Sequence, residues 1–508
     1  MSSLIADTVF ATIAECIRRH AQDRPTALAL ADDGASLSYT ALDALMDRVA
    51  AALQRDGLKP GDAIALCAAP SATQAAIFLG ALRAGVVVAP LAPGSTPAAL
   101  ARMLADAQAL RLFVDATTAA EFAGSTLPVT HIDDGLDAWL APAGAVPTAV
   151  AIGPGAPFNI IYSSGTTGEP KGIVQPHGMR WAHVRRGLPY GYGPAAVTLL
   201  ATPLYSNTTL VVFFPSLAFG GAVVLMSKFD ARRYAEIAQR MRATHTMLVP
   251  VQYQRLMALP DFETFDLRSF HMKFCTSAPF PAALKADVLK RWPGGLVEFY
   301  GMTEGGGTCI LEAHAHADKL HTVGRPAPGT DMRLMDEAGR ELPPGSTGEV
   351  VGHSPGMMVG YHRRPEATRE AEWFDASGKR FIRTGDVGRF DADGFLVLMD
   401  RRKDMIISGG FNIYPSDLEA QLREHPAVDD AAVVGVPSPD WGETPVAFVV
   451  CRAGHDEDGR ERCANGSTQR VGKTQRLAAL HRVDELPRSA IGKVLKRELR
   501  ERHAKMPP

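Results

Sequence analysis

Apolar runs and amphipathic stretches alternate along the first part of the chain. Short apolar segments at residues 63–66, 86–90 and 110–114 have the length of buried strands. Between them, residues 71–84 and 97–107 repeat apolar positions with helical spacing. Such alternation is typical of a parallel sheet that is covered by helices on both faces. The pattern therefore predicts an α/β fold built of βαβ units.

The alternation continues to about residue 330, after which the texture changes. Further predicted strands lie at residues 158–162, 197–201, 221–226 and 246–249, and further predicted helices at residues 40–53, 177–186, 210–217 and 231–242. From residue 331 to 399, short strands separated by Gly, Pro and Asp turns predict a small β-rich subdomain. We therefore expect a large N-terminal domain that contains several subdomains.

A run of five charged residues at 400–404 lies between two apolar strands. The chain beyond it contains a strand at 405–407, a helix at 417–424 and a strand at 431–436. Ser416 and Glu419 have the spacing of a capping box at the start of that helix. We place a domain boundary at the charged run. Residues 1–400 form the large domain, and residues 401–508 form a small α+β domain.

Composition and charge serve only to exclude classes of partner. The 508 residues are 46% hydrophobic and 21% charged, with a formal net charge of −2, which gives no electrostatic reason to expect nucleic acid or an anionic membrane as a partner. The most apolar region, residues 195–226, is interrupted by Pro203, Asn207 and Pro215, so we expect no membrane span. The six cysteines form no C-x-x-C pair and no secretion signal precedes the fold, which predicts a cytoplasmic protein.

Residues 161–172 form a loop rich in glycine and hydroxyl groups directly after a predicted strand. Glycines let backbone N–H groups turn toward an anion, Ser and Thr hydroxyls donate hydrogen bonds, and Lys171 adds a positive charge. The loop is therefore suited to bind phosphate. A Walker loop is excluded, because Pro170 and Lys171 stand where that motif needs Gly-Lys-Ser/Thr.

Three further stretches carry candidate chemistry. They are Glu298-Phe299-Tyr300-Gly301-Met302-Thr303-Glu304, then Phe381-Ile382-Arg383-Thr384-Gly385-Asp386 followed by Arg401 and Lys403, and finally Pro487-Arg488-Ser489-Ala490-Ile491-Gly492-Lys493. In order and spacing, these stretches and the phosphate loop resemble the acyl- and aryl-CoA synthetases of the adenylate-forming superfamily. The resemblance covers nearly the whole chain.

The resemblance implies how ATP and Mg²⁺ are bound. The residues expected to bind ATP or AMP are Ser163, Ser164, Gly165, Thr166, Thr167, Gly168, Lys171, Ser277, Ala278, Pro279, Tyr300, Gly301, Met302, Thr303, Asp386, Arg401 and Lys493. Within this set, Tyr300 offers a flat face to adenine and the Asp386 carboxylate accepts both ribose hydroxyls. The expected catalytic residues are Lys493, Glu304 and Thr303, and Glu304 is the expected Mg²⁺ ligand.

The implied reaction is that of an ATP-dependent carboxylic acid:CoA ligase. The acid attacks the α-phosphorus of ATP to form acyl-AMP and pyrophosphate, and the thiol of coenzyme A then displaces AMP. The small domain is expected to be mobile and to turn about Lys403 between the two steps. The residues expected to contact CoA are Ser408, Gly409, Gly410, Trp441, Lys473 and Arg476.

The acyl pocket is expected to be uncharged. Its predicted lining is Tyr205, Ser206, Asn207, Thr208, Gly305 and Gly306. Many aryl-CoA synthetases have histidine where Ser206 stands, and this departure leaves the pocket's shape and any gating there open. Glycines after Glu304 suggest room for a ring or an alkyl chain. The predicted substrate is a benzoate- or cinnamate-like acid or a medium-chain fatty acid.

Other readings of the same motifs stay open. An adenylate-forming enzyme could pass the acyl group to an acceptor other than CoA. An oxygenase of luciferase type would use the same adenylation half-reaction. A non-catalytic acyl or adenylate sensor would be expected to lose Lys493, Glu304 or the phosphate loop, and all three are present. The sequence also leaves the oligomeric state open, a homodimer included.

Overall fold

A computed structural model describes residues 2–163, 171–401, 404–408, 411–438, 442–452, 477–489 and 492–506. Its contacts divide the chain into two compact units. Unit 1 comprises Met1–Asp331 and Gly352–Ile382, and unit 2 comprises Met332–Val351 and Arg383–Pro508. The domain boundary expected at residue 400 remains a prediction. Each unit is described by itself below.

Unit 1 contains two large sheets. The nine-stranded sheet has the order β15-β14-β13-β12-β11-β9-β10-β1-β2, and the seven-stranded sheet has the order β18-β8-β7-β4-β3-β5-β6. The strands of the first are β1 (Leu28–Ala31), β2 (Ser36–Ser38), β9 (Val197–Leu200), β10 (Ala222–Leu225), β11 (His245–Leu248), β12 (Met272–Cys275), β13 (Gly295–Gly301), β14 (Thr308–Glu312) and β15 (Arg325–Pro326). Those of the second are β3 (Ala63–Cys67), β4 (Val87–Pro90), β5 (Ala109–Val114), β6 (Val129–His131), β7 (Pro157–Ser163), β8 (Lys171–Pro176) and β18 (Gly360–Tyr361).

The central strands of both sheets pair in parallel, and antiparallel strands lie toward the edges. Strands β13, β12, β11, β9, β10 and β1 run parallel in the first sheet, as do β7, β4, β3, β5 and β6 in the second. All five residues of β3 are buried, as expected of a strand covered on both faces. The predicted α/β fold is confirmed.

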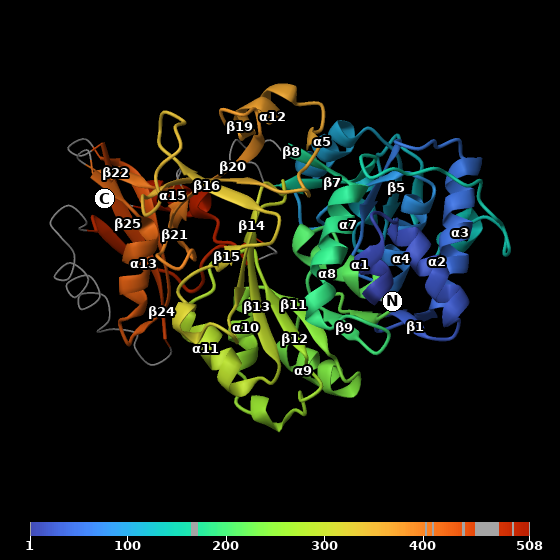
Figure 1. Cartoon of the computed structure of the whole chain (residues 1–508), viewed down its shortest axis with the longest axis horizontal. Coiled ribbons are helices and arrows are strands. Elements are labelled where there is room, and N and C mark those ends of the chain that lie inside the picture. The colour runs from blue at the N-terminus through green and yellow to red at the C-terminus, as the bar shows by residue number, and fades with distance from the viewer. Residues whose placement is uncertain are drawn as a thin grey trace. The chain divides into compact units, whose positions relative to one another are not determined.

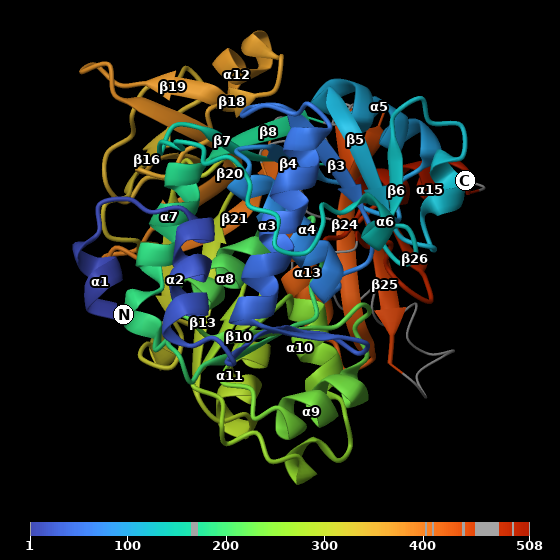
Figure 2. The ribbon, with the colours of Figure 1, turned by 90° about the vertical axis from the view of Figure 1, so that its right-hand side faces the viewer.

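Helices fill the space between the sheets and cover their outer faces. The helices of unit 1 are α1 (Ser2–Asp7), α2 (Ile13–Asp23), α3 (Tyr39–Arg55), α4 (Ala72–Arg83), α5 (Pro97–Ala107), α6 (Leu136–Trp139), α7 (His177–Arg186), α8 (Asn207–Ala218), α9 (Ala231–Arg240), α10 (Pro250–Met257), α11 (Ala282–Arg291) and α12 (Pro365–Ala371). Helix α4 packs on β3 and β4, α8 packs on β9 and β10, and α2 contacts both helices (Figure 2). Figure 1 shows α9, α10 and α11 beside β11–β13.

One hydrophobic core spans the helices between the two sheets. Ile64 and Val88 from one sheet, Val223 from the other, and Phe78 and Phe214 from α4 and α8 belong to it. The aromatic rings of Phe78, Phe158 and Phe214 pack together with ring-centre distances of 4.9–6.2 Å. This shared core holds the carboxyl end of β7 in a defined place relative to α7 and α8.

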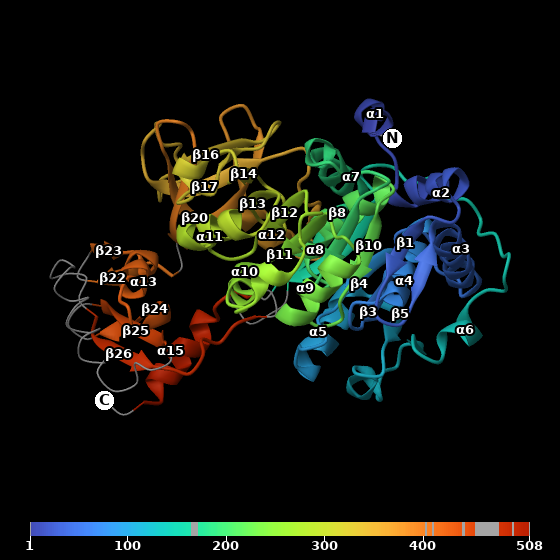
Figure 3. The same cartoon turned by 90° about the horizontal axis from the view of Figure 1, so that it is seen from below.

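Unit 2 contains most of a third sheet and a small α/β layer. The third sheet consists of β16 (Asp331–Met335), β17 (Gly348–His353), β19 (Glu372–Phe374), β20 (Arg380–Phe390) and β21 (Leu396–Arg401), and it matches the predicted β-rich subdomain. The last sheet consists of β22 (Ile406–Ser408), β23 (Phe411–Ile413), β24 (Val428–Ser438), β25 (Gly442–Cys451) and β26 (Ala479–Arg482), with helices α13 (Pro415–Arg423) and α15 (Lys496–Ala504) (Figure 3).

Alternate side chains of β24 point to opposite faces of that last sheet. Ala431 and Val433 pack with Leu418 of α13, whereas Val434 packs with Leu499 of α15. Successive side chains of a strand point to opposite faces, so the two helices cover opposite sides of the sheet.

Among the residues that the structure describes, no helix is long and apolar enough to cross a membrane.

The predicted capping box of α13 is wrong. The helix begins at Pro415, one residue before Ser416, and no side chain caps its Tyr414 N-cap. The Ser416 hydroxyl instead donates to the Met399 carbonyl. Glu419 accepts from the Val433 backbone N–H at 2.9 Å and pairs with Lys496. Tertiary partners therefore bind both side chains that the local pattern had assigned to the cap.

Three buried histidines of unit 1 predict acid sensitivity. Burial lowers the pKa of His177 and of His245 to about 4, and it lowers the pKa of His183 well below its usual value. Below the ordinary histidine pKa the unfolded chain binds these protons while the folded chain does not, so stability falls as pH falls from about 6.5 toward 4. Each histidine contributes up to about 1.4 kcal/mol per pH unit to the pH dependence of the free energy of unfolding.

Urea denaturation at several pH values between 7.5 and 5 measures this slope. A His177→Phe variant is expected to show a shallower slope than the unmodified protein, because one proton-binding difference is removed. Exposed His131 is the control, and His131→Asn should leave the slope unchanged. An identical slope in all three proteins would refute the assignment of acid sensitivity to His177.

Candidate active site

The predicted phosphate loop joins β7 to β8 as a hairpin. Ser163 pairs with Lys171 and Tyr162 with Gly172 across the antiparallel strands. Ser164, Gly165, Thr166, Thr167 and Gly168 lie outside the described residues. At the near end of β8, the Lys171 ammonium lies 5.2 Å from the centre of the Tyr361 ring. The described residues on either side of the predicted loop, Ser163 and Lys171, therefore face each other across β7 and β8.

Tyr361 connects this lysine to Glu304. Its hydroxyl donates to Oε1 of Glu304 at 2.8 Å. Burial and the neighbouring negative charge of Glu304 raise the pKa of Tyr361 above its usual value, so the phenol stays protonated. The Glu304 carbonyl also accepts from the Met358 N–H at 2.8 Å. Sequence reasoning missed Tyr361, because only the pairing of β18 with β8 brings it beside the motif.

Tyr300 and Gly301 are the last two residues of β13, and Met302 and Thr303 follow the strand. Tyr300 pairs with Cys309 on β14 and is half-buried. The Thr303 carbonyl accepts a hydrogen bond from the Gln175 side-chain amide at 2.7 Å. The motif is therefore held by a strand on one side and by β8 on the other.

Ser277, in the loop that follows β12, contacts the first turn of α8. The side chains of Ser277 and Thr208 form a hydrogen bond. Ser277 has φ +84°, a left-handed conformation that costs a non-glycine residue roughly 1–2 kcal/mol. Ser206 is the N-cap of α8, and its hydroxyl oxygen accepts from the Thr208 N–H at 3.3 Å. Ser206, which was singled out as a departure from many aryl-CoA synthetases, thus caps the helix.

Gly305 and Gly306 have a different reason for being glycine from the one predicted. A Cβ at Gly305 would lie 2.1 Å from the Gly356 carbonyl oxygen, and one at Gly306 would lie 2.5 Å from Cβ of Ile382. Protein atoms occupy the space beside both residues. Their missing side chains permit close packing of the loop after Glu304, and this correction removes the argument that they leave room for substrate.

In unit 2, the predicted ribose-binding pair lies on neighbouring strands. Asp386 on β20 pairs in register with Arg401 on β21. The Asp386 N–H donates to the Thr384 hydroxyl at 3.0 Å, and that hydroxyl donates to the Val350 carbonyl at 2.8 Å. Asp386 is half-buried.

Lys493 belongs to a tight hairpin before α15. Its backbone N–H donates to the Ser489 hydroxyl at 3.2 Å, and its carbonyl accepts from the Ser489 N–H at 2.8 Å. Gly492 has φ +76°, which glycine adopts without strain. The Arg488 guanidinium donates to the Gly492 carbonyl at 2.6 Å and also to Asp430 on β24. Arg488 thereby ties the hairpin to the sheet.

We expect Arg488→Met to slow acyl-adenylate formation about 10- to 100-fold, because the loss of a charge-assisted hydrogen bond is worth about 1.5–3 kcal/mol. Thioester formation from supplied acyl-AMP and CoA should change less. Arg423 also contacts Asp430, at 3.3 Å, but it has no hydrogen bond or ion pair with the described residues of the hairpin, so Arg423→Met is the matched control. Equal losses in both variants would contradict a role of Arg488 in placing the hairpin.

The predicted CoA-contacting residues are only partly described. Ser408 is buried at the end of β22 and pairs with Gly442 on β25. Gly409, Gly410, Trp441, Lys473 and Arg476 lie outside the described residues, as does the predicted hinge, Lys403. The structure therefore leaves their roles as predictions.

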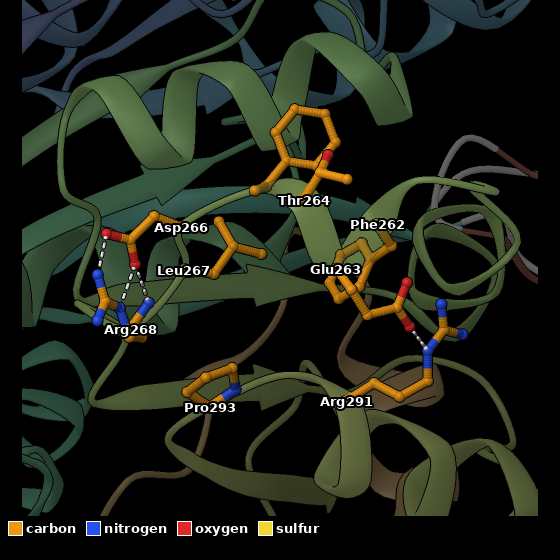
Figure 4. A pocket seen from close by; sticks show the side chains of 9 residues that line it. Phe262, Glu263, Thr264, Asp266, Leu267, Arg268, Arg291 and Pro293 are labelled. Carbon is orange, nitrogen blue, oxygen red and sulfur yellow. Dashed lines mark hydrogen bonds and ion pairs between the residues drawn. The ribbon is translucent and has the colours of Figure 1, made fainter.

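A surface cavity of about 340 Å³ is lined by residues outside these motifs. Its lining runs from Phe262 to Arg268, with Arg291 and Pro293. Figure 4 shows that its charged groups pair with each other, Asp266 with Arg268 and Glu263 with Arg291. None of the predicted site residues lines this cavity.

Comparisons with known proteins agree with the motifs. A sequence model of the AMP-binding enzyme family matches residues 17–362, and a model of the AMP-binding enzyme C-terminal domain matches residues 417–493. The chain belongs to the AMP-binding enzyme family. Its expected place among the adenylate-forming acyl-CoA synthetases is confirmed.

Individual relatives span nearly the whole chain. Feruloyl-CoA synthase of an Amycolatopsis species is 35% identical over 503 residues, covering 95% of this chain and 97% of the relative. The crystal structure of ATP-bound MatB from Rhodopseudomonas palustris superposes with a TM-score of 0.88 at 30% identity, covering 97% of this chain and 99% of that one. Amide bond synthetase McbA from Marinactinospora thermotolerans gives 0.84 at 30% identity, with 96% and 99% covered.

Proposed function

We propose that this AMP-forming acid–thiol ligase activates an aromatic carboxylic acid of the hydroxycinnamate kind and transfers it to CoA. The observation that carries the choice of acid is the 35% identity to a feruloyl-CoA synthase over 95% of the chain. The uncharged stretch at the start of α8 supports it, because neither Ser206 nor Thr208 would oppose a neutral ring. A medium-chain fatty acid is the second candidate.

In the first half-reaction, the substrate carboxylate attacks the α-phosphorus of ATP and pyrophosphate leaves. Lys493 offsets the negative charge that meets at the reacting atoms. The phosphate loop and Lys171 hold the leaving phosphates, while Asp386 and Arg401 hold the ribose. In the second half-reaction, the CoA thiol attacks the acyl carbon and AMP leaves, after the small domain (residues 401–508) has turned about Lys403.

The residues present fit a Mg²⁺ ion. Mg²⁺ in nucleotide sites takes one or two carboxylates together with phosphate oxygens. Glu304 supplies one such carboxylate, and the Tyr361 hydroxyl orients it through a hydrogen bond to Oε1. When bound, the ion would neutralise phosphate charge. The chain's own part is to hold Glu304 in place through Tyr361 and the Met358 N–H.

Pyrophosphate release from ATP and Mg²⁺ with a panel of acids tests the proposal. Ferulate, coumarate, benzoate, indoleacetate and octanoate should be compared with and without CoA. Highest kcat/KM for a hydroxycinnamate, with formation of its CoA thioester, is the expected result. Activity with octanoate alone would select the fatty-acid candidate, and no acid-dependent pyrophosphate from any acid would refute the proposed reaction.

The acceptor is tested in the same assay. Each active acid is incubated with CoA, with a simple amine, or with a phosphopantetheinylated carrier protein. The amine arm is included because one structural relative is an amide bond synthetase. Thioester formation with CoA at the highest rate is expected, and faster amide or carrier acylation would reassign the acceptor.

We also propose a cytoplasmic location and leave a homodimer as a prediction. The location is supported by the free thiols of the described cysteines, which are Cys16, Cys67, Cys275, Cys309 and Cys451. Free thiols are typical of a reducing compartment. Burial raises the pKa of Cys275 and of Cys309 above the usual value, so both stay protonated and neither acts as a nucleophile.

A further inference from the structure

A buried arginine lies beside the active-site motif without an acidic partner in the described part of the chain. Arg180 on α7 is 1% exposed, and the aromatic rings of Phe158 and Phe214 lie 5.6 Å from its guanidinium carbon. Buried arginines are ordinarily paired with a carboxylate. Here the guanidinium donates to side-chain amides, so its role is not to form a salt bridge.

Three amide oxygens and one histidine nitrogen surround the guanidinium. Oδ1 of Asn159 accepts from Nε at 3.2 Å and from a terminal nitrogen at 3.0 Å. Oδ1 of Asn207 accepts at 2.7 Å, and Oε1 of Gln175 accepts as well. His183 lies 3.5 Å away through Nδ1, and burial lowers its pKa, so its ring is neutral and accepts.

This arrangement fixes which way each amide points. Arginine has only donors, so every amide that touches it must present its oxygen. The amide nitrogen of Asn159 then donates to Oε1 of Gln175 at 3.1 Å. The amide nitrogen of Gln175 must point the other way, where it donates to the Thr303 carbonyl at 2.7 Å and lies 3.4 Å from Oδ1 of Asn207.

The directed hydrogen bonds end on two parts of the proposed site. Thr303 precedes Glu304 in the nucleotide motif, and Asn207 is the first residue of α8, next to the Ser206 cap. Asn159, Gln175 and Arg180 are all buried, whereas Asn207 is half-buried. The buried Arg180 guanidinium therefore orients the amide of Gln175, which contacts the nucleotide motif, and the amide of Asn207, which lies in the predicted acyl-pocket stretch.

We propose that Arg180 is a positioning residue that, through Gln175, places the Thr303–Glu304 segment against the first turn of α8. The role deepens the proposed function and rests on it. Arg180 itself does not touch substrate. It makes the Gln175 amide a donor toward Thr303, and the Thr303 hydroxyl and Glu304 carboxylate are thereby held where ATP binds.

Two isosteric substitutions separate this role from simple support of the core. Gln175→Glu gives Arg180 a carboxylate partner but removes the N–H that Thr303 accepts from, and it sets two oxygens against each other. Asn159→Asp gives the same guanidinium the same charge and likewise sets a carboxylate oxygen against Oε1 of Gln175, but it leaves the hydrogen bond from Gln175 to Thr303 in place. Both variants are expected to melt within a few degrees of the unmodified protein, so they differ chiefly in the Thr303 contact.

Titration calorimetry with ATP and Mg²⁺, without any acid, measures the effect independently of the substrate's identity. Gln175→Glu is expected to weaken ATP binding at least tenfold, and Asn159→Asp less than threefold. Equal affinities in the two variants would overturn the proposal. If Gln175→Glu does not fold, Gln175→Met removes the same donor without adding charge, and unchanged ATP affinity in it would also overturn the proposal.

The outcome is distinguishable from failure of the proposed function. An unmodified protein that binds ATP but releases no pyrophosphate with any acid would refute the ligase assignment, while the calorimetric comparison would still decide the role of Arg180. Conversely, an active ligase in which Gln175→Glu binds ATP normally would keep the function and remove the positioning role.

Discussion

Replacement of Lys493 by alanine is expected to reduce acyl-adenylate formation by about 10²–10³-fold, the size of effect seen when one preorganised charge-stabilising group is removed. The hairpin that carries Lys493 is held by Ser489 and by Arg488, so its backbone should persist in the variant. Thioester formation from supplied acyl-AMP and CoA should stay within a few-fold of normal, because the proposed role of the lysine is confined to the first half-reaction.

Single-turnover measurements of pyrophosphate release and of thioester formation separate the two steps. Arg497 provides the control, since it lies four residues further along, is exposed, and pairs only weakly with Glu501 at 3.5 Å. Arg497→Ala removes one positive charge from the same segment and should leave both rates unchanged. If Lys493→Ala loses both half-reactions equally, the division of labour between the two steps is wrong.

Gly305→Ala is expected to destabilise the fold by more than about 3 kcal/mol, in the range of overpacking combined with backbone strain. Gly305 has φ +74°, and its added methyl would lie 2.1 Å from the Gly356 carbonyl oxygen and 2.8 Å from the end of Met179. The carbonyl is backbone and cannot move aside as a flexible side chain would. The loop that carries Glu304 must therefore shift.

Gly329→Ala is the matched control. Gly329 has φ +78°, nearly the same, but a Cβ there meets nothing within 4 Å. It should cost only the conformational strain of roughly 1–2 kcal/mol. Urea denaturation measures both variants, and ATP affinity should fall in Gly305→Ala alone. Equal losses of stability would show that the close approach to Gly356 is unimportant.

Elements with a strong local pattern were predicted closely. Helix α7 was expected at residues 177–186 and is found there, and β24 extends the strand expected at residues 431–436. The phosphate loop was correctly expected after a strand, since β7 ends at Ser163. Apolar periodicity predicts such elements because burial of an apolar face is what selects them.

Long-range contacts account for what was missed. Tyr361 reaches Glu304 only because β18 pairs with β8, and the two residues are 57 positions apart. Arg180 and Gln175 carry no motif, and their sequence neighbours give no sign of an amide cluster. Ser416 and Glu419 match a cap locally, but stronger tertiary partners bind both.

Hydrophobic periodicity and motif spacing are local properties of the chain, so the α/β architecture, the family and the identity of the candidate catalytic residues could be predicted without a structure. The reason why Gly305 and Gly306 lack side chains, the contact by which Tyr361 holds Glu304, and the way Arg180 orients the groups around Thr303 became visible in the folded protein alone. Those features depend on atoms that meet across strands and helices distant in sequence, where close packing and hydrogen-bond direction select one arrangement.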